Sequence, residues 1–211
     1  MASNCPLCQS TNHYKYYAST SSHYLRCGEC DLVFVPNQFH LSISEEKSRY
    51  DSHNNSPTDQ KYRQFLKKTF DPLVAFIGKG SSGLDFGCGP GPTLSVMLEE
   101  CGHEVDLYDK FYYPNSYIFN KKYDFITATE VIEHLDEPGK ELTKLYGMLK
   151  DCGVLAVMTS MISGDTNFSS WYYKDDPTHI CFYSRRTMDY LADKWQANVK
   201  FYGGDVALFF K

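Results

Sequence analysis

The feature that most limits the fold of this chain is the stretch LDFGCGPGPT, from Leu84 to Thr93. Its first residues have the apolar character of a short buried strand, and the residues that follow it predict a helix. Gly87, Gly89 and Gly91 lie between the two and allow the backbone to turn sharply and to lie against a ligand. The same glycines would also suit a tight strand–helix turn without a ligand. The context favours the ligand, because Asp109, at the end of the next predicted strand, could bond ribose hydroxyls.

Apolar segments alternate with helical patterns from residue 58 to the end of the chain. The predicted strands are SGLDFG, HEVDLYD, a short segment around residues 117–119, YDFITAT, VLAVMTS, NVKFY and VALFF. The predicted helices are residues 59–70, residues 93–101, the stretch EVIEHL, residues 138–152 and residues 185–195. Pro72 is expected to break or kink the first, Gly153 to end the fourth, and Ser184 to cap the last. This alternation predicts an α/β fold with a mostly parallel sheet, helices on both faces, and an antiparallel hairpin at the end.

Four of the eight cysteines form two C-x2-C pairs, Cys5 with Cys8 and Cys27 with Cys30. Each pair can present two thiolates from one tight turn, and two such pairs predict tetrahedral coordination of a structural zinc ion. Two disulfides or a redox pair would be the alternatives, but no βαβ pattern surrounds CPLC and a cytosolic chain keeps its thiols reduced. We therefore predict a zinc ribbon over residues 1–40, a polar linker over residues 41–57 that breaks most readily at residues 54–57, and a larger domain over residues 58–211.

Composition limits the partners. Apolar residues make up 42% of the 211 residues, enough for a core, and the net charge of −5 provides no basic field for a nucleic acid. No apolar run approaches the ~20 residues that cross a bilayer, and MASNCPLC lacks the features of a signal peptide. We expect a cytoplasmic protein that does not bind membranes. The oligomeric state is not predicted.

Three motifs together, LDFGCGPG, VDLYD and YDFITATEVIEHL, resemble those of class I S-adenosylmethionine (SAM)-dependent methyltransferases. The resemblance covers about residues 60–211. The four-cysteine head is similar to that of a subgroup that includes deoxysugar C-methyltransferases, and a ribosomal-RNA guanine methyltransferase begins with a similar zinc module. The resemblance implies a Rossmann-like seven-stranded sheet in the order 3-2-1-4-5-7-6, with strand 7 antiparallel.

The resemblance also implies a cofactor site. The residues that would surround the methionine end of SAM are Asp85, Phe86, Gly87, Cys88, Gly89 and Gly91 from the glycine-rich turn, and Thr129, Glu130 and Val131 from the end of the fourth strand. Asp109 would bind the ribose, and Lys110 with its aromatic neighbours would pack on the adenine. The adenine contact stays open, because only 14 residues separate Asp109 from Asp124, where the family often has a longer third strand.

The stretch WYYKDDPTHICFY, residues 171–183, combines aromatic and titratable side chains after the predicted fifth strand. Ligands of open α/β sheets bind beyond the carboxyl ends of the strands, so this stretch is predicted to face the acceptor. His179 is the candidate general base, with Asp176 as an orienting or substrate-binding partner. Tyr172 and Tyr173 are candidates for substrate contact and catalysis. The alternative for His179 is a histidine satisfied at a strand edge.

His134, in EVIEHL, is a second catalytic candidate that could instead brace its own turn. The predicted activity is SAM-dependent methyl transfer to a small-molecule acceptor, of which a sugar-like molecule is one example. One alternative is an RNA methyltransferase, for which the ribbon offers only Lys15 and Arg26. The other is a binding module without activity, which would have a damaged glycine-rich turn; this one is intact.

Overall fold

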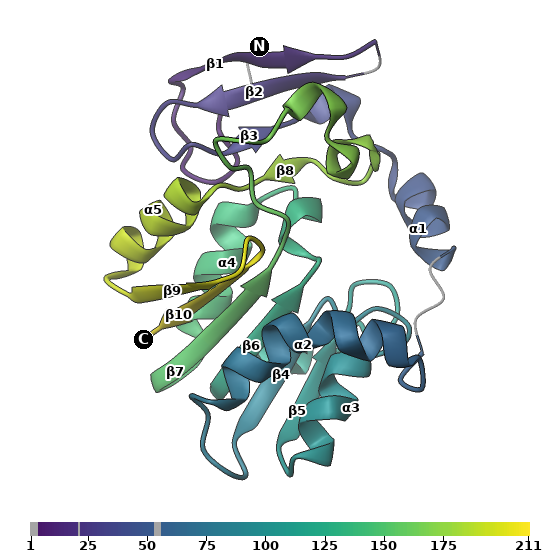
Figure 1. Cartoon of the computed structure of the whole chain (residues 1–211), viewed down its shortest axis with the longest axis vertical. Coiled ribbons are helices and arrows are strands. Elements are labelled where there is room, and N and C mark those ends of the chain that lie inside the picture. The colour runs from purple at the N-terminus through teal and green to yellow at the C-terminus, as the bar shows by residue number, and fades with distance from the viewer. Residues whose placement is uncertain (1–3, 21, 53–55) are drawn as a thin grey trace.

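The computed structural model describes residues 4–20, 22–52 and 56–211, so Asn54 and Asn55 of the predicted break lie outside the described residues. These described residues form two sheets and five α-helices (Figure 1). The strands are β1 His13–Ala18, β2 His23–Cys27, β3 Val33–Phe34, β4 Ser82–Phe86, β5 Glu104–Tyr108, β6 Tyr123–Thr129, β7 Leu149–Met158, β8 Cys181–Phe182, β9 Asn198–Tyr202 and β10 Val206–Phe210. The α-helices are α1 Ile43–Asp51, α2 Gln60–Val74, α3 Thr93–Glu100, α4 Pro138–Gly147 and α5 Arg185–Trp195. Within the described residues no helix is both long and apolar enough to cross a bilayer.

The main sheet has six strands in the order β5-β4-β6-β7-β10-β9. The first four are parallel, and β10 runs antiparallel to both β7 and β9, as the closing hairpin of the sequence predicts. The predicted seven strands are wrong, because the 3-10 helix η2, Ser116–Asn120, takes the place expected for the third. A parallel third strand would need one crossover from β5 and a second one to β6, each of a dozen or more residues. The chain between β5 and β6 is too short for both, because it consists only of residues 109–122.

The two faces of the main sheet carry different helices. Along β7, Val154, Ala156 and Met158 pack with α2 and α3, whereas Leu155 and Val157 pack with α4 and α5. This alternation follows from the two-residue period of a strand and places helices on both faces, as predicted (Figure 1).

Two predicted helix ends are wrong. Helix α2 passes Pro72 and ends at Val74, because a proline in the last turn costs the helix few of its hydrogen bonds. Helix α4 ends at Gly147 rather than just before Gly153, because strand β7 already begins at Leu149, which pairs with Tyr123 of β6. Gly153 therefore lies inside β7. The stretch EVIEHL is helical only over the 3-10 turn η3, Ile132–His134. Ser184 caps α5 as predicted, through a hydrogen bond from the backbone N–H of Thr187.

The predicted linker contains helix α1, which stands at the side of the molecule between strands β1–β3 and α2 (Figure 1). A capping box begins it: Glu45 N–H donates to Ser42 Oγ, and Ser42 N–H donates to Glu45 Oε2 at 2.9 Å. The polar composition of this segment hid the S-x-x-E signature of a helix start. The segment predicted as a linker is therefore helical over Ile43–Asp51.

The second sheet, in the order β1-β2-β3-β8, takes three strands from the first 40 residues and the fourth from the other end of the chain. Val33 pairs with Phe182, and Phe34 pairs with Cys181. Ser184 Oγ also donates to Asp31 Oδ2 at 2.6 Å. The end of the WYYKDDPTHICFY stretch therefore returns to the fold through the ribbon.

The first cysteine knuckle lies directly on the start of α4. Gly139 N–H donates to Pro6 O at 3.3 Å, and a Cβ at position 139 would lie 2.2 Å from Leu7 O. Backbone atoms cannot move aside as a flexible side chain can. Glycine is therefore required at position 139 for the ribbon to reach its place.

We expect Gly139→Ala to lower the free energy of unfolding by about 1–3 kcal/mol, because the new methyl group overpacks the junction. Gly147→Ala, at the end of the same helix, is the matched control, because nothing lies within 4 Å of its added Cβ. It should be neutral or stabilise by up to about 1 kcal/mol. Thermal unfolding of both variants decides the matter; equal melting temperatures would show that the junction tolerates a side chain.

Candidate functional site

A cavity of about 610 Å³ lies beyond the carboxyl ends of β4, β5 and β6. This is the edge where open α/β sheets bind ligands. Most of the predicted site residues line it: Phe86, Gly87, Cys88, Gly89, Asp109, Lys110, Thr129, Glu130, Val131, His134, Tyr172, Tyr173, Asp176 and His179. Asp85 and Gly91 do not line the cavity.

The glycine-rich turn forms one wall. Gly87 and Gly89 adopt φ angles of 73° and 64°, in the left-handed region that favours glycine. A Cβ at Gly87 would lie 2.4 Å from Val131 Cγ2, so the turn and the end of β6 are in close contact. A Cβ at Gly89 would meet nothing within 4 Å, which leaves its backbone open to a ligand.

The Asp109 carboxylate organises the opposite wall. Its Oδ2 accepts a hydrogen bond from Gly89 N–H at 3.1 Å, and its Oδ1 accepts from Phe111 N–H at 2.8 Å and from Tyr112 N–H at 3.1 Å. One side chain therefore fixes both the glycine-rich turn and the aromatic turn after β5. Asp106 lies on the same strand but bonds Lys121 and Tyr123 outside the cavity lining.

Asp85 supports the turn from below. It is 4% exposed, and its Oδ1 accepts a hydrogen bond from Thr127 Oγ1 at 2.8 Å. Burial raises the pKa of the Asp85 carboxyl from 3.8 to about 6, against the opposing effect of the Thr127 bond. Asp85 thus lies at the end of β4 beneath the glycine-rich turn rather than in the cavity lining, and its contact with a cofactor stays a prediction.

The far end of the cavity is a cluster of Glu133, His134, Tyr173 and His179. The Tyr173 hydroxyl donates to Glu133 Oε1 at 2.6 Å and lies 3.1 Å from the Thr159 hydroxyl. The rings of His134 and His179 lie 4.7 Å apart, and the Tyr173 ring lies 4.2 Å from that of His179. The predicted catalytic residues are thus brought together, and Glu133 joins them.

Burial dominates the electrostatics of this cluster. It raises the pKa of Glu130 to about 8, helped by the nearby Glu133 carboxyl, and it raises the pKa of Glu133 as well. It lowers the pKa of His134 to about 4 and that of His179 below its ordinary value. Both imidazoles are therefore neutral near pH 7, and each has a nitrogen lone pair to offer. Glu130 also adopts a φ of 54°, a strained conformation at the mouth of the cavity.

The expected pair of Asp176 and His179 does not form. Asp176 accepts hydrogen bonds from Thr178 Oγ1 at 2.6 Å and from Arg49 Nη2 at 2.9 Å, whereas His179 Nδ1 bonds Tyr173 O at 2.6 Å. Burial opposes ionisation of Asp176, but the bonds from Thr178 and Arg49 outweigh it and hold its pKa below the ordinary value. Asp176 thus fixes α1 to the rim, and Tyr172, 76% exposed, stands at the edge of the opening.

Sequence reasoning missed the contribution of α1. Arg49 and Tyr50 line the cavity, and the Tyr50 ring contacts that of His134 at 5.3 Å. Helix α1 also binds the turn after β5, where Glu46 accepts a hydrogen bond from Lys110 Nζ at 2.7 Å and Asp51 accepts one from Tyr112. The capping box at Ser42 was the signal that could have revealed the helix, though not its place over the cavity.

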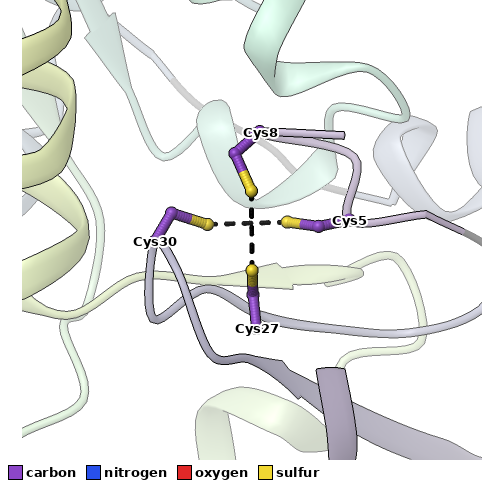
Figure 2. Close-up of side chains that lie close together, drawn as sticks. All are labelled: Cys5, Cys8, Cys27 and Cys30. Atoms are coloured by element: carbon purple, nitrogen blue, oxygen red, sulfur yellow. Dashed lines mark hydrogen bonds between the residues drawn. The ribbon is translucent and has the colours of Figure 1, made fainter. Parts of the chain in front are cut away.

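The four predicted metal ligands converge at a separate point in the ribbon (Figure 2). Cys5 Sγ lies 3.5 Å from Cys30 Sγ, Cys8 Sγ lies 3.5 Å from Cys27 Sγ, and all four sulfurs lie within 4.8 Å of one another. Four thiolates around an ion at about 2.3 Å would stand roughly 3.8 Å apart, so the donor set suits a tetrahedral metal. The four cysteines are free rather than disulfide-bonded.

The buried Asp85 carboxyl predicts a pH-dependent cost to stability. Its pKa is raised on folding, so between about pH 4 and pH 6 the folded state binds more protons and stability falls as pH rises. Asp85→Asn keeps an acceptor for Thr127 and removes this titration. We expect the free energy of unfolding of the variant to exceed that of the parent at pH 7–8 by at most about 3 kcal/mol. This difference should disappear near pH 4. Urea unfolding between pH 4 and pH 8 measures this difference, and Asp151→Asn, at an exposed position, is the control. A stability gain that does not change with pH would contradict the raised pKa of Asp85.

Comparison with known proteins identifies the fold. The methyltransferase domain family model matches residues 58–199. No curated protein matches the sequence closely enough to be called a relative.

Three solved structures show the same fold at low identity. The 1,6-didemethyltoxoflavin N1-methyltransferase of Burkholderia thailandensis has a TM-score of 0.53 and 13% identity, over 93% of this chain and 97% of that one. A SAM-dependent methyltransferase of Archaeoglobus fulgidus has a TM-score of 0.53 and 16% identity, over 71% and 99%. The mitomycin 7-O-methyltransferase has a TM-score of 0.50 and 15% identity, over 79% and 66%. Since the family model spans well over half of the sequence, the chain belongs to the methyltransferase domain family.

Proposed function

We propose that this protein is a SAM-dependent methyltransferase that acts on a small-molecule acceptor bearing hydroxyl groups. The observation that carries the proposal is the cavity itself, which joins the glycine-rich turn, the Asp109 carboxylate and the polar cluster around His179 in one space. Its volume of about 610 Å³ falls in the range of small-ligand sites, roughly 300–1,000 Å³.

The residues present fit SAM. The open backbone at Gly89 suits the methionine end, with Thr129, Glu130 and Val131 opposite, and the Asp109 carboxylate can accept hydrogen bonds from ribose hydroxyls. Phe111 and Tyr112 offer apolar surface beside Lys110 for the adenine. When bound, SAM supplies an activated methyl group on a sulfonium, so the protein mainly has to position the acceptor, and positioning lowers such barriers by ~7–11 kcal/mol.

His179, Tyr173 and His134 are proposed as the groups that activate the acceptor. The two imidazoles line the cavity with lone pairs, and the Tyr173 hydroxyl lies among them. Tyr172 and Asp176 are proposed as substrate contacts at the rim. Two structural neighbours are named for small-molecule acceptors, toxoflavin precursors and mitomycin, which supports the same class here.

A nucleic-acid acceptor is not favoured. Of the two cationic side chains between residues 4 and 40, Arg26 is engaged by Asp31 through bonds of 2.8 and 2.9 Å. This leaves the ribbon without a basic cluster for phosphates.

The ribbon is proposed to hold one structural zinc ion through Cys5, Cys8, Cys27 and Cys30. Four thiolates leave no open position for chemistry, so the role is structural. All eight cysteines are free, which supports a reducing compartment, for which we propose the cytoplasm.

Calorimetry with SAM and its demethylated product, S-adenosylhomocysteine, tests the function. The wild-type protein should bind both saturably. Asp109→Asn should weaken binding by about 10–100-fold, because a charged hydrogen bond contributes about 1.5–3 kcal/mol. Asp106→Asn, on the same strand but outside the cavity lining, should leave the affinity unchanged.

No saturable binding by folded, zinc-loaded wild-type protein would refute the SAM assignment. Equal losses in the two variants would show that Asp109 acts only through the stability of the fold.

Metal analysis tests the ribbon. Wild-type protein should contain one tightly held zinc ion, and Cys30→Ser should lose it and unfold at a lower temperature. Because β3 pairs with β8, this loss should also weaken cofactor binding at the cavity. Cys101→Ser changes an exposed thiol outside the ribbon and should keep the zinc. A folded Cys30→Ser protein with a full zinc complement would contradict the assignment.

A further inference from the structure

The cluster at the far end of the cavity contains three side chains that can bind a metal ion, one carboxylate and two imidazoles. One atom from each of Glu133, His134 and His179 lies within 4.8 Å of the other two. Glu133 and His134 come from the turn after β6, whereas His179 comes from the segment before β8. Residues 45 positions apart therefore converge on one point.

Both imidazoles are oriented in the way that metal-binding histidines usually are. His134 Nδ1 lies 3.0 Å from Thr178 O, and His179 Nδ1 lies 2.6 Å from Tyr173 O. A carbonyl oxygen can only accept, so each Nδ1 carries the proton and each Nε2 carries the lone pair. Backbone carbonyls thus fix both tautomers and both ring positions, as they do for histidines that bind metals.

The Glu133 carboxylate lacks a cationic partner. Its side chain is fully buried, Oε1 accepts from the Tyr173 hydroxyl, and Oε2 has no hydrogen-bond partner among the described residues. Among those residues its one contact with a basic group is with His134 Nε2, 3.9 Å from Oε1, and that imidazole is neutral near pH 7. A buried carboxylate with an unsatisfied oxygen costs several kcal/mol unless something compensates it.

The geometry points to a binding site for one first-row divalent transition metal ion, held by Glu133 together with His134 Nε2 and His179 Nε2. Bonds of about 2.1 Å place three equally spaced ligands of one ion about 3.4–3.6 Å apart, so ligand atoms that lie within 4.8 Å of one another need to close by up to about 1.4 Å. Two imidazoles and one carboxylate suit zinc, iron(II), cobalt or manganese, rather than the all-oxygen sites of calcium and magnesium. This ion is distinct from the ribbon metal, which four thiolates would hold.

The site gives the ion a role in acceptor binding, an inference that rests on the proposed function. Three protein ligands leave coordination positions open, and the two histidines line the cavity. An acceptor that offers a hydroxyl or carbonyl oxygen to the ion would be held and oriented at this end. His134 and His179 would then activate the acceptor through the ion, because their Nε2 lone pairs are bound to it. The acceptor is thereby narrowed to molecules with an oxygen donor beside the atom that is methylated.

Cobalt(II) is a suitable probe, because thiolate sites prefer zinc and a zinc-loaded ribbon will keep its own ion. Calorimetric and optical titration of full-length, zinc-loaded protein with Co2+ should show one further equivalent bound. His134→Ala and His179→Ala should each weaken this binding by about tenfold or more. His23→Ala, an exposed histidine on the ribbon, should leave it unchanged.

Glu133→Gln provides a variant of nearly unchanged shape in case a histidine variant does not fold, and it should weaken Co2+ binding comparably. The ribbon zinc content and the affinity for S-adenosylhomocysteine of the same samples report on folding. If wild-type protein binds S-adenosylhomocysteine but no second metal, or if all variants bind Co2+ equally, the metal site is refuted and the proposed function stands. If Co2+ binds as expected but S-adenosylhomocysteine does not, the metal site stands and the proposed function is wrong.

Discussion

The pairing of β3 with β8 is the interaction on which the rest of the structure depends. It consists of two residue pairs, reinforced by the bond from Val35 N–H to Ile180 O at 2.9 Å and by the buried contact of Ser184 with Asp31. These bonds fix the chain immediately after His179. The histidine is therefore positioned from one side by the ribbon and from the other by the end of β6, where Ile180 N–H donates to Glu133 O at 2.9 Å. The ribbon is a wall of the site rather than an appendage to it.

Much of this architecture could be predicted from sequence, because the relevant signals are local. The glycine-rich turn and each cysteine pair depend on spacings of a few residues, and Asp109 is found at the end of the next strand. The structure brings the turn and Asp109 together, and it brings the two cysteine pairs together. The helices and strands of the larger domain also follow from their periodicity. The prediction of a third strand was wrong, because the sequence shows a short apolar segment there but does not show the distance that a crossover must span.

What could not be predicted depends on contacts between distant segments. Nothing local shows that Arg49, in a polar stretch, would bond Asp176 rather than water, or that Asp176 would therefore be unavailable to orient His179. The pairing of β8 with the ribbon was not predicted for the same reason: two strand residues give no signal for their partner until β3 lies beside them. Glu133 was not among the predicted catalytic residues, because the sequence does not show that its carboxyl group is buried beside the two histidines.

Helix α1 has a consequence for how the structure responds to salt. None of its residues is buried, and polar side-chain contacts fix it to the body of the molecule, Glu46 with Lys110, Arg49 with Asp176 and Asp51 with Tyr112. Each such surface pair contributes about 1 kcal/mol or less and is screened by salt. The Tyr50 ring adds contacts with Phe111 and His134, so α1 is held by both polar pairs and aromatic packing. Added salt should accordingly weaken the polar part of this attachment and leave the aromatic part in place.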